Sequence, residues 1–311
     1  MLIDYFLYFN EKELLELRIN LLKDHVDKFV ICESSKTFSG IPREFQVKKL
    51  IKELGLPEEK IQVIELVIPE DRDLIVEDHD ALSMFPEDRG DIVSIRAMAR
   101  DRLTRNGLMT IIDQFSDDDW FIVSDCDEII NPEHIGFALH MANTCQNTFI
   151  KLPLINLYGE ADLRPYFKDG SPFTWRTAMT ICRRTMFYLT TPQNIRCDWM
   201  LPFNWANPTV NGVIFENFGW HFSWMGGSER VAIKSQSYAH APNKSHIEQR
   251  NKGFKFVEGE SLTWENNSVL LKFPHNELPQ EIFRLPRVLN FLLPNYSKKQ
   301  VKKLSIPSRK F

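Results

Sequence analysis

Apolar and polar positions alternate along the first third of the chain in a way that predicts strands and helices in turn. Residues 2–9 are almost entirely apolar, which is typical of a strand buried on both faces of a parallel sheet. Asn10 suits a helix N-cap, and leucines follow it at helical spacing from Leu14 onward. Residues 26–33 form the next apolar run. The order strand, helix, strand predicts a βαβ unit.

The same alternation continues towards the middle of the chain. The pattern predicts a helix over residues 45–54, a strand over 60–68 and a long helix over 91–105, after which residues 117–124 lead into an acidic motif. Residues 70–91 are charged and irregular, which indicates a surface loop or a lid over a ligand. The expected fold class is therefore α/β, with a mostly parallel central sheet flanked by helices.

After residue 150 the pattern changes to short β-like pieces separated by loops rich in Pro and Asn. The pieces cover residues 148–157, 178–183 and 213–218, and a helix capped by Ser228 is expected over 228–241. A helical, Pro-punctuated tail ends the chain.

Tryptophans gather in this second half. Core packing explains some of them, and aromatic platforms for sugar rings are the second interpretation. The cluster consists of Trp175, Trp199, Trp205, Trp220 and Trp224.

Composition narrows the classes of function. With 311 residues, 43% of them hydrophobic, the chain can build a sizeable core, as one large domain or as one domain with an extension. A net charge of −4 gives no general argument for nucleic acid, although the residues from 284 onward hold eight Lys or Arg and no acidic residue. This basic tail, 284–311, suits a solvated face or peripheral contact with an anionic membrane. Five cysteines without metal-site spacing indicate reduced thiols, and no run is long enough for a membrane span. We expect a cytoplasmic protein.

The strongest chemical motif is acidic. Residues 120–130 read WFIVSDCDEII, an apolar strand that runs directly into Asp125, Cys126, Asp127 and Glu128. Strands of open α/β sheets present side chains at their carboxyl ends to a ligand crevice. Two carboxylates held together there repel each other unless a cation such as Mn²⁺ or Mg²⁺ lies between them, and such an ion leaves positions for substrate phosphates. A solvated acidic loop is the alternative interpretation.

Two later segments offer partners for this motif. His221 follows an apolar run and is a candidate third metal ligand, with His240 as the competing choice. Glu229, after Gly226 and Gly227, lies at an expected helix start, where the dipole favours an ionised carboxylate that could serve as a general base. Helix capping is the simpler interpretation of Glu229.

Basic residues precede the acidic motif. Arg96 and Arg100 lie four apart on the helix expected over residues 91–105, with Arg102 close by, so they could reach a diphosphate or brace Asp127 and Glu128. Surface salt bridges are equally consistent with the pattern. The sequence contains no P-loop and no G-x-G-x-x-G, which favours a diphosphate held through a metal over one cradled by glycines.

Several of these segments together resemble glycosyltransferase family 17. The resemblance rests on FNE at residues 9–11, LLELR at 14–18, VDKFVI at 26–31, ES at 33–34 and TFSG at 37–40. It continues with IVSDCDEI at 122–129 and GWHFSW at 219–224, with Glu229 and Lys234 beyond. The matches occur in order from about residue 3 to about residue 240.

The resemblance implies a GT-A fold and an inverting transfer of a sugar, N-acetylglucosamine from UDP-N-acetylglucosamine, to a sugar hydroxyl. It implies that Asp125, Asp127 and His221 hold Mn²⁺ or Mg²⁺ and that Glu229 is the catalytic base. We expect Asn10, Glu33, Arg96, Arg100 and Asp125 to contact the donor. The expected organisation is a catalytic domain over 1–250, with a nucleotide-sugar-binding half (1–130) and an acceptor half (131–250), and a basic helical extension over 251–311.

The acceptor and two other functions stay open. The chain shows no membrane anchor and has few cysteines, which favours a glycan or glycolipid acceptor in the cytoplasm over an N-glycan. A nucleotidyltransferase acting on sugar phosphates also uses paired carboxylates, but normally shows a Gly-rich loop where this chain has residues 9–13. A catalytically inactive carbohydrate-binding protein would not need the acidic motif.

Overall fold

The central sheet of the computed structural model joins strands from both halves of the chain. The structure describes residues 1–82, 89–144, 149–175, 179–196, 209–210, 213–214, 217–242, 247, 256–262 and 268–296. The central sheet has the strand order β3-β2-β1-β4-β10-β6, with β1 to β4 parallel to one another and β10 antiparallel to its neighbours β4 and β6. Its strands are β1 (Leu2–Leu7), β2 (Lys28–Ser34), β3 (Ile61–Leu66), β4 (Trp120–Asp125), β10 (Thr180–Arg183) and β6 (Ile150–Lys151).

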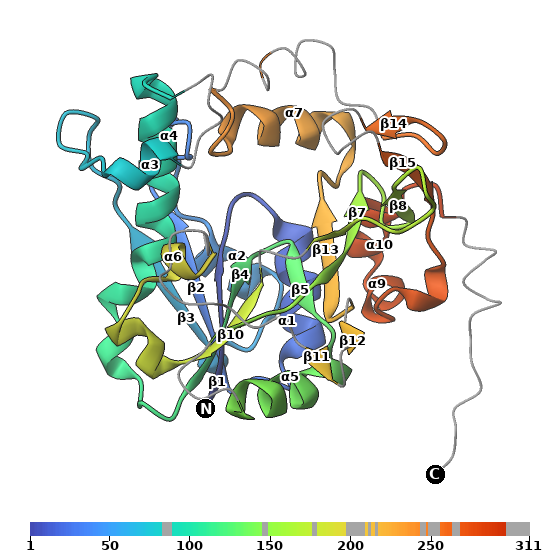
Figure 1. Ribbon diagram of the computed structural model, residues 1–311, viewed down its shortest axis with the longest axis horizontal. Coiled ribbons are helices and arrows are strands. Elements are labelled where there is room, and N and C mark those ends of the chain that lie inside the picture. The colour runs from blue at the N-terminus through green and yellow to red at the C-terminus, as the bar shows by residue number, and fades with distance from the viewer. Residues whose placement is uncertain are drawn as a thin grey trace.

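Alternate side chains of β1 serve two different cores, as expected for a strand buried on both faces. Leu2 and Phe6 pack with one core, while Ile3, Tyr5 and Leu7 pack with the other. The first core is covered by α1 (Lys12–Leu22), α2 (Val47–Glu53) and α5 (Pro132–Thr144). The second is covered by residues 106–115, by the 3₁₀ turn Arg184–Tyr188 and by α6 (Pro192–Arg196). The predicted α/β class, with helices on both faces of a mostly parallel sheet, is confirmed (Figure 1).

Two smaller sheets carry the second half of the chain. One has the order β5-β13-β7-β9, formed by β5 (Glu128–Ile130), β13 (Gly219–Ser223), β7 (Leu154–Tyr158) and β9 (Thr174–Trp175). The other contains β14 (Ser261–Leu262), β15 (Ser268–Lys272) and β8 (Leu163–Tyr166), and a two-stranded pair joins β11 (Thr209–Val210) to β12 (Val213–Ile214). Because β5 follows β4 almost directly, the acidic motif lies where the central sheet meets the first of these.

The remaining helices of the described residues are α3 (Asp78–Leu82), α4 (Ile92–Arg105), α7 (Gly227–Ser237), α9 (Glu281–Arg284) and α10 (Pro286–Leu292). Helix α4 contacts β1 and β2, and α3 packs on α4. Helices α9 and α10 pack on α1, and Ile282, Val288 and Leu292 belong to the same core cluster as Leu14. No helix in the described ranges combines the length and apolarity needed to cross a bilayer.

Helix starts show both agreement with the sequence and error. Asp91 caps α4 by accepting from the backbone N–H groups of Val93 and Ser94, as the predicted helix start requires. Asn10 is not an N-cap: its backbone takes the left-handed φ of +50°, so the first helix begins later, with Glu11 at the cap position. Ser228 is not a cap either, because Gly226, with φ of +93°, ends the turn and places Ser228 inside the first turn of α7.

The cysteines, the segment 70–91, the tryptophans and the basic tail lie only partly within the described residues. Cys32, Cys126 and Cys182 are free and buried, in agreement with reduced thiols, whereas Cys145 and Cys197 lie outside the described residues. The irregular segment 70–91 contains α3, and its residues 83–88 lie outside the described ranges. Trp199, Trp205 and most of the basic tail also lie outside them.

Candidate active site

The acidic motif forms the turn between β4 and β5. Asp125 is the last residue of β4 and pairs in register with Leu7 of β1, so the turn lies at the carboxyl ends of the parallel strands. Asp127 follows in the turn, and Glu128 begins β5. This is the edge at which open α/β sheets bind their ligands.

A buried arginine of α1 holds this turn from beneath. Arg18 is fully buried, and its Nη1 donates to the carbonyl oxygens of Asp125 (2.6 Å) and Glu128 (2.7 Å). Its Nη2 donates to Ser124 Oγ (2.7 Å) and to Asp4 Oδ1 (2.5 Å). Asp4 is also fully buried and supplies the compensating charge. One guanidinium therefore fixes the backbone on both sides of the acidic residues.

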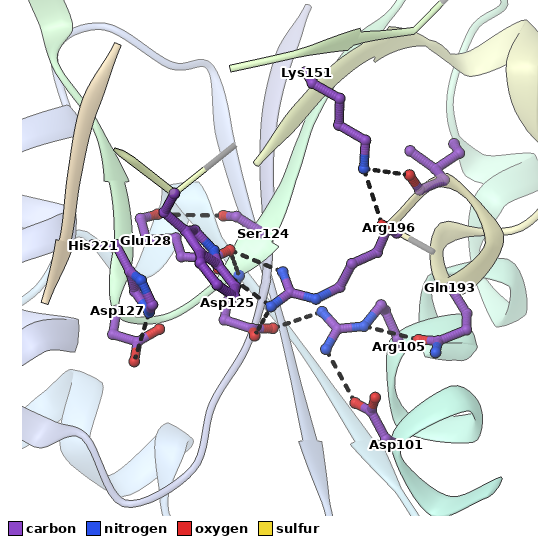
Figure 2. Close-up of polar contacts among 12 residues, drawn as sticks. Asp101, Arg105, Ser124, Asp125, Asp127, Glu128, Lys151, Gln193, Arg196 and His221 are labelled. Carbon is purple, nitrogen blue, oxygen red and sulfur yellow. Dashed lines mark hydrogen bonds and ion pairs between the residues drawn. The ribbon is translucent and has the colours of Figure 1, made fainter. Parts of the chain in front are cut away.

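Two further guanidinium groups hold the Asp125 carboxylate. Arg105 Nη1 lies 2.6 Å from Oδ1, and Arg196 Nη2 lies 2.7 Å from Oδ2 (Figure 2). Burial acts to raise the pKa of Asp125, but Arg105 and Arg196 outweigh it and the pKa lies below the ordinary value. Asp125 is therefore ionised and firmly oriented.

Glu128 is fully occupied by protein donors. Its Oε1 accepts from Trp175 Nε1 (3.0 Å) and Arg196 Nη2 (3.2 Å), and its Oε2 accepts from Arg196 Nη1 (3.0 Å) and the Asp125 backbone N–H (2.9 Å). Arg196 thus bridges Asp125 and Glu128. The buried Lys151 donates to the carbonyl oxygens of Ile195 (2.6 Å) and Arg196 (3.0 Å), which fixes the end of α6.

Asp127 faces a different set of groups. Lys234 Nζ of α7 lies 2.6 Å from Oδ2, and His221 Nε2 of β13 lies 3.7 Å from the same oxygen. Burial acts to raise the pKa of Asp127, but Lys234 and His221 bring it well below its usual range. Ligand atoms of Asp127, Glu128 and His221 all lie within 4.8 Å of one another. The His221 ring also packs at 5.1 Å on the Trp175 ring.

A fourth carboxylate, that of Glu11, approaches from the residue before α1. Glu11 Oε1 lies 3.7 Å from Lys234 Nζ, and both residues line a small cavity of about 30 Å³ between α1 and α7. Burial, followed by the nearby charge of Asp127, raises the pKa of Glu11 to about 8. Neither its position nor its raised pKa was predicted from the sequence.

The residues predicted for the metal and the base meet only in part. Asp125, Asp127 and His221 come to one place, as expected, whereas the cluster with metal-ligand spacing contains Glu128 in place of Asp125. Glu229 lies in the first turn of α7 with an exposed side chain. The N-cap residue of this helix is Gly226, whereas the sequence analysis assigned capping to Ser228 or Glu229. His240 packs edge-to-face against Tyr238.

The residues predicted to contact the donor are more dispersed. Arg100 pairs with Asp71 and donates to the Phe38 carbonyl, and Arg96 Nη1 lies 3.8 Å from Asp71. The prediction that Arg96 and Arg100 brace the acidic motif is wrong, because α4 turns them towards the segment around Asp71.

Two further residues that were predicted near the site, Arg102 and Glu33, bind other groups of the protein. Arg102 binds Asp80 and Glu77. The Glu33 carboxylate is fully buried and accepts from the backbone N–H groups of Gln46 and Val47 at the start of α2.

Asn10 lies at the edge of the site. Its carbonyl oxygen accepts from Arg230 Nη1 at 2.6 Å, which ties the β1–α1 loop to α7. The loop and the acidic turn therefore approach each other at the same sheet edge.

Sequence reasoning missed the arginines that hold the site. Arg18 could have been suspected, because a charged residue lies on the apolar face of a helix, between leucines at helical spacing. Arg105 lies one turn beyond Asp101, with which it forms an ion pair, but nothing local indicates that it reaches Asp125. Arg196 and Lys151 come from segments whose meeting depends on the whole fold.

Comparison with known families decides the class of this site. The family model of glycosyltransferase family 17 matches residues 1–188, more than half of the chain and including the acidic turn. The chain belongs to glycosyltransferase family 17. It is accordingly a glycosyltransferase, as the resemblance of the sequence motifs predicted.

Solved structures add only distant similarity to this glycosyltransferase. A 4-diphosphocytidyl-2C-methyl-D-erythritol synthase matches with a TM-score of 0.37 and 10% identity, over 69% of this chain and 92% of the other. Mannose-6-phosphate isomerase from Helicobacter pylori matches with a TM-score of 0.33 and 11% identity, over 60% and 72%. The galactosyltransferase LgtC with donor and acceptor sugar analogues matches with a TM-score of 0.33 and 11% identity, over 83% and 85%. No curated protein sequence matches the chain.

Proposed function

We propose that this glycosyltransferase moves N-acetylglucosamine from UDP-N-acetylglucosamine to a sugar hydroxyl of a glycan or glycolipid, with inversion and with help from a divalent cation. The observation that supports it best is the ionised Asp127 beside His221 at the carboxyl edge of the parallel strands. The identity of the donor follows the family resemblance. Cytoplasmic location and membrane contact through residues 284–311 stay predictions.

The side chains at Asp127 fit a hard divalent cation. Asp127 Oδ1 receives no hydrogen bond from the described residues, and His221 Nε2 lies 3.7 Å from the other oxygen of this carboxylate. Carboxylate and imidazole together suit Mn²⁺ or Mg²⁺. Asp127 and His221 would hold the ion, while the four donors on Glu128 and the two guanidinium groups on Asp125 orient those carboxylates around it. When bound, such an ion neutralises charge on the leaving diphosphate.

The protein side chains supply the rest of the chemistry. Lys234, already on Asp127, adds a positive charge close to the place proposed for the diphosphate. The acceptor oxygen forms its bond to the anomeric carbon while the bond from that carbon to the diphosphate oxygen breaks, and the electron pair leaves with UDP. Glu229 takes the proton of the acceptor hydroxyl, since it lies exposed in the first turn of the helix that carries Lys234.

Thermal unfolding with UDP, with Mn²⁺ and with both tests the metal and donor site. If UDP and Mn²⁺ together are present at about 100 times their apparent Kd, the wild type should gain roughly 2.7 kcal/mol of stability. Asp127→Asn should lose this gain and also lose transfer. Asp118→Asn changes an aspartate whose side chain is 92% exposed and should behave as wild type. Stabilisation by UDP that depends on neither Mn²⁺ nor Asp127 would contradict the proposal.

A further inference from the structure

Three polar side chains form a row across the sheet that carries His221. His221 of β13 pairs in register with Glu128 of β5 on one side and with Asn156 of β7 on the other. Residues paired in register present their side chains to the same face of a sheet, and neighbouring strands lie about 4.7–4.9 Å apart. Asn156 is therefore the neighbour of His221 on the side away from Glu128.

Trp175 shows that this row faces the candidate active site. It pairs in register with Leu154 of β7, two residues before Asn156, so its side chain belongs to the same face. From β9 the indole reaches across the sheet: its ring centroid lies 5.1 Å from that of His221, and its Nε1 donates to Glu128 Oε1 at 3.0 Å. Asn156, on the strand that the indole crosses, has no exposed surface, so bulk water cannot solvate its amide.

Both Asn156 and His221 carry polar atoms that lack hydrogen bonds. The Oδ1 and Nδ2 atoms of Asn156, and Nδ1 of His221, are buried and have no partner among the residues that the structure describes. Thr174 Oγ1 is the other such side-chain atom in the described strands of this sheet, but Thr174 pairs with Ile155 and so lies on the opposite face. A buried amide and a buried ring nitrogen are costly when they stay unpaired, whereas a bond between them serves both.

The two ring nitrogens of His221 have different surroundings. Nε2 is directed to the acidic turn, where it lies 3.7 Å from Asp127 Oδ2, too far for a hydrogen bond (Figure 2). That oxygen already accepts from Lys234 Nζ at 2.6 Å. A neutral imidazole has one N–H donor and one acceptor nitrogen. A proton on Nδ1 can be donated to the Asn156 amide oxygen, and it leaves the lone pair of Nε2 directed at Asp127.

We infer that Asn156 is a positioning residue for His221: its Oδ1 accepts from His221 Nδ1–H, which fixes the ring and directs the unprotonated Nε2 to the proposed cation. The terminal torsion of an asparagine is soft, so a rotation of the amide is enough to make this bond. Asn156 acts through His221 and does not ligate the cation. Imidazole ligands of metal ions are commonly held through their second nitrogen in this way. The part of the inference that concerns the cation rests on the proposed function.

Nitrogen-15 NMR of the full chain tests the pairing without any metal. In buffer with a chelator, at a pH where the imidazole is neutral, the wild-type His221 ring should carry its proton on Nδ1; the signals missing from His221→Gln identify the ring. Asn156→Leu exchanges the amide for an apolar group of similar size, so the preference should be lost and the two tautomers should mix. Ser268→Ala is the matched control, because it removes a buried hydroxyl of β15 that has no partner in the described part of the chain. A wild-type ring protonated on Nε2, or an Asn156→Leu ring that keeps its proton on Nδ1, would overturn the inference.

Binding of Mn²⁺ in the presence of UDP tests the consequence for the site. Electron paramagnetic resonance of free Mn²⁺ should give a dissociation constant roughly 10- to 100-fold higher for Asn156→Leu than for wild type, while Ser268→Ala should bind as wild type. Equal affinities in Asn156→Leu and wild type would show that Asn156 does not position a ligand. If the wild-type ring carries its proton on Nδ1 but wild type does not bind Mn²⁺, the pairing of Asn156 with His221 stands and the cation of the proposed function is overturned.

Discussion

At the scale of single residues, the acidic turn depends on a cation that never contacts solvent. Arg18 and Asp4 are both fully buried, and Phe6 lies against the guanidinium at 4.1 Å. An unpaired buried charge is costly, so each partner requires the other. The pair also provides the donors that hold the carbonyl groups of Asp125 and Glu128.

Arg18→Met should destabilise the protein by about 3–5 kcal/mol, because it leaves the Asp4 carboxylate buried without its cation. Urea unfolding measures the loss, and transfer should fall with it because the acidic turn loses its support. Arg287→Met is the matched control: that arginine has a 47% exposed side chain and pairs with Glu16 at the surface, so about 0–1 kcal/mol is expected. Equal small losses in both variants would show that the turn does not need Arg18.

The raised pKa of Glu11 makes the stability of the protein fall as the pH rises. Its pKa of about 8 lies above the ordinary value of 4.5, because burial and Asp127 oppose ionisation more than Lys234 favours it. The folded state therefore holds a proton that the unfolded state releases, and the contribution to stability is lost as the pH rises from about 4.5 to about 8. The negative charge of Asp125 also raises the pKa of Glu11.

Glu11→Gln should remove this slope. In buffer with a chelator, the stability of Glu11→Gln relative to wild type should increase with pH across that window and level off above it. Thermal unfolding at a series of pH values provides the measurement. Glu58→Gln, at an exposed position, should keep the wild-type profile. Parallel profiles for wild type and Glu11→Gln would mean that Glu11 ionises normally.

At the scale of elements, local pattern was sufficient for the first strands and helices but not for their contacts. Residues 2–9 were predicted as a buried strand and residues 26–33 as the next strand, and β1 and β2 confirm both strands. The partners of Arg96 and Arg100 could not be read in the same way, since helical spacing shows that two residues share a face but not what that face meets. Asp71 lies 25 residues before Arg96 in the chain.

The backbones of β13 and β5 approach each other closely at Gly219. A Cβ at Gly219 would lie 2.1 Å from the Ile129 carbonyl oxygen and 2.8 Å from Ile130 Cα. Because these are backbone atoms, no rotamer change can relieve the clash. The sequence GWHFSW at 219–224 thus needs its glycine for packing, apart from any chemistry of His221.

Gly219→Ala should force β5 away from β13 and separate Asp127 from His221, with a loss of stability above 2 kcal/mol, beyond the usual effect of one substitution. Gly136→Ala is the control within α5, where an added Cβ meets nothing within 4 Å. That variant should gain about 0.5–1 kcal/mol, the usual benefit of Ala over Gly in a helix. Urea unfolding compares the two. A Gly219→Ala protein as stable as wild type would show that β5 and β13 leave room for a Cβ at this position.

At the scale of the whole molecule, residues from both sides of the predicted domain boundary at residue 250 pack into one hydrophobic core. Helices α9 and α10 come from the segment expected to form an extension, yet Ile282, Val288 and Leu292 are buried in the cluster that contains Leu14 and Leu17 of α1. This packing could not be predicted from the sequence, because the amphipathic pattern of a short helix does not show which element its apolar face contacts.

Ile282→Ala therefore tests whether the chain unfolds as one unit. Ile282 is fully buried, so the truncation should cost about 2–5 kcal/mol, whereas Arg284→Ala, with a 73% exposed side chain, should change stability by less than about 0.5 kcal/mol. Hydrogen exchange is the informative measurement, because β1 amides report global unfolding. If the core is shared, Ile282→Ala lowers the protection of β1 as much as that of α10. If protection falls in α10 alone, the C-terminal helices form a separate unit and the predicted boundary is correct.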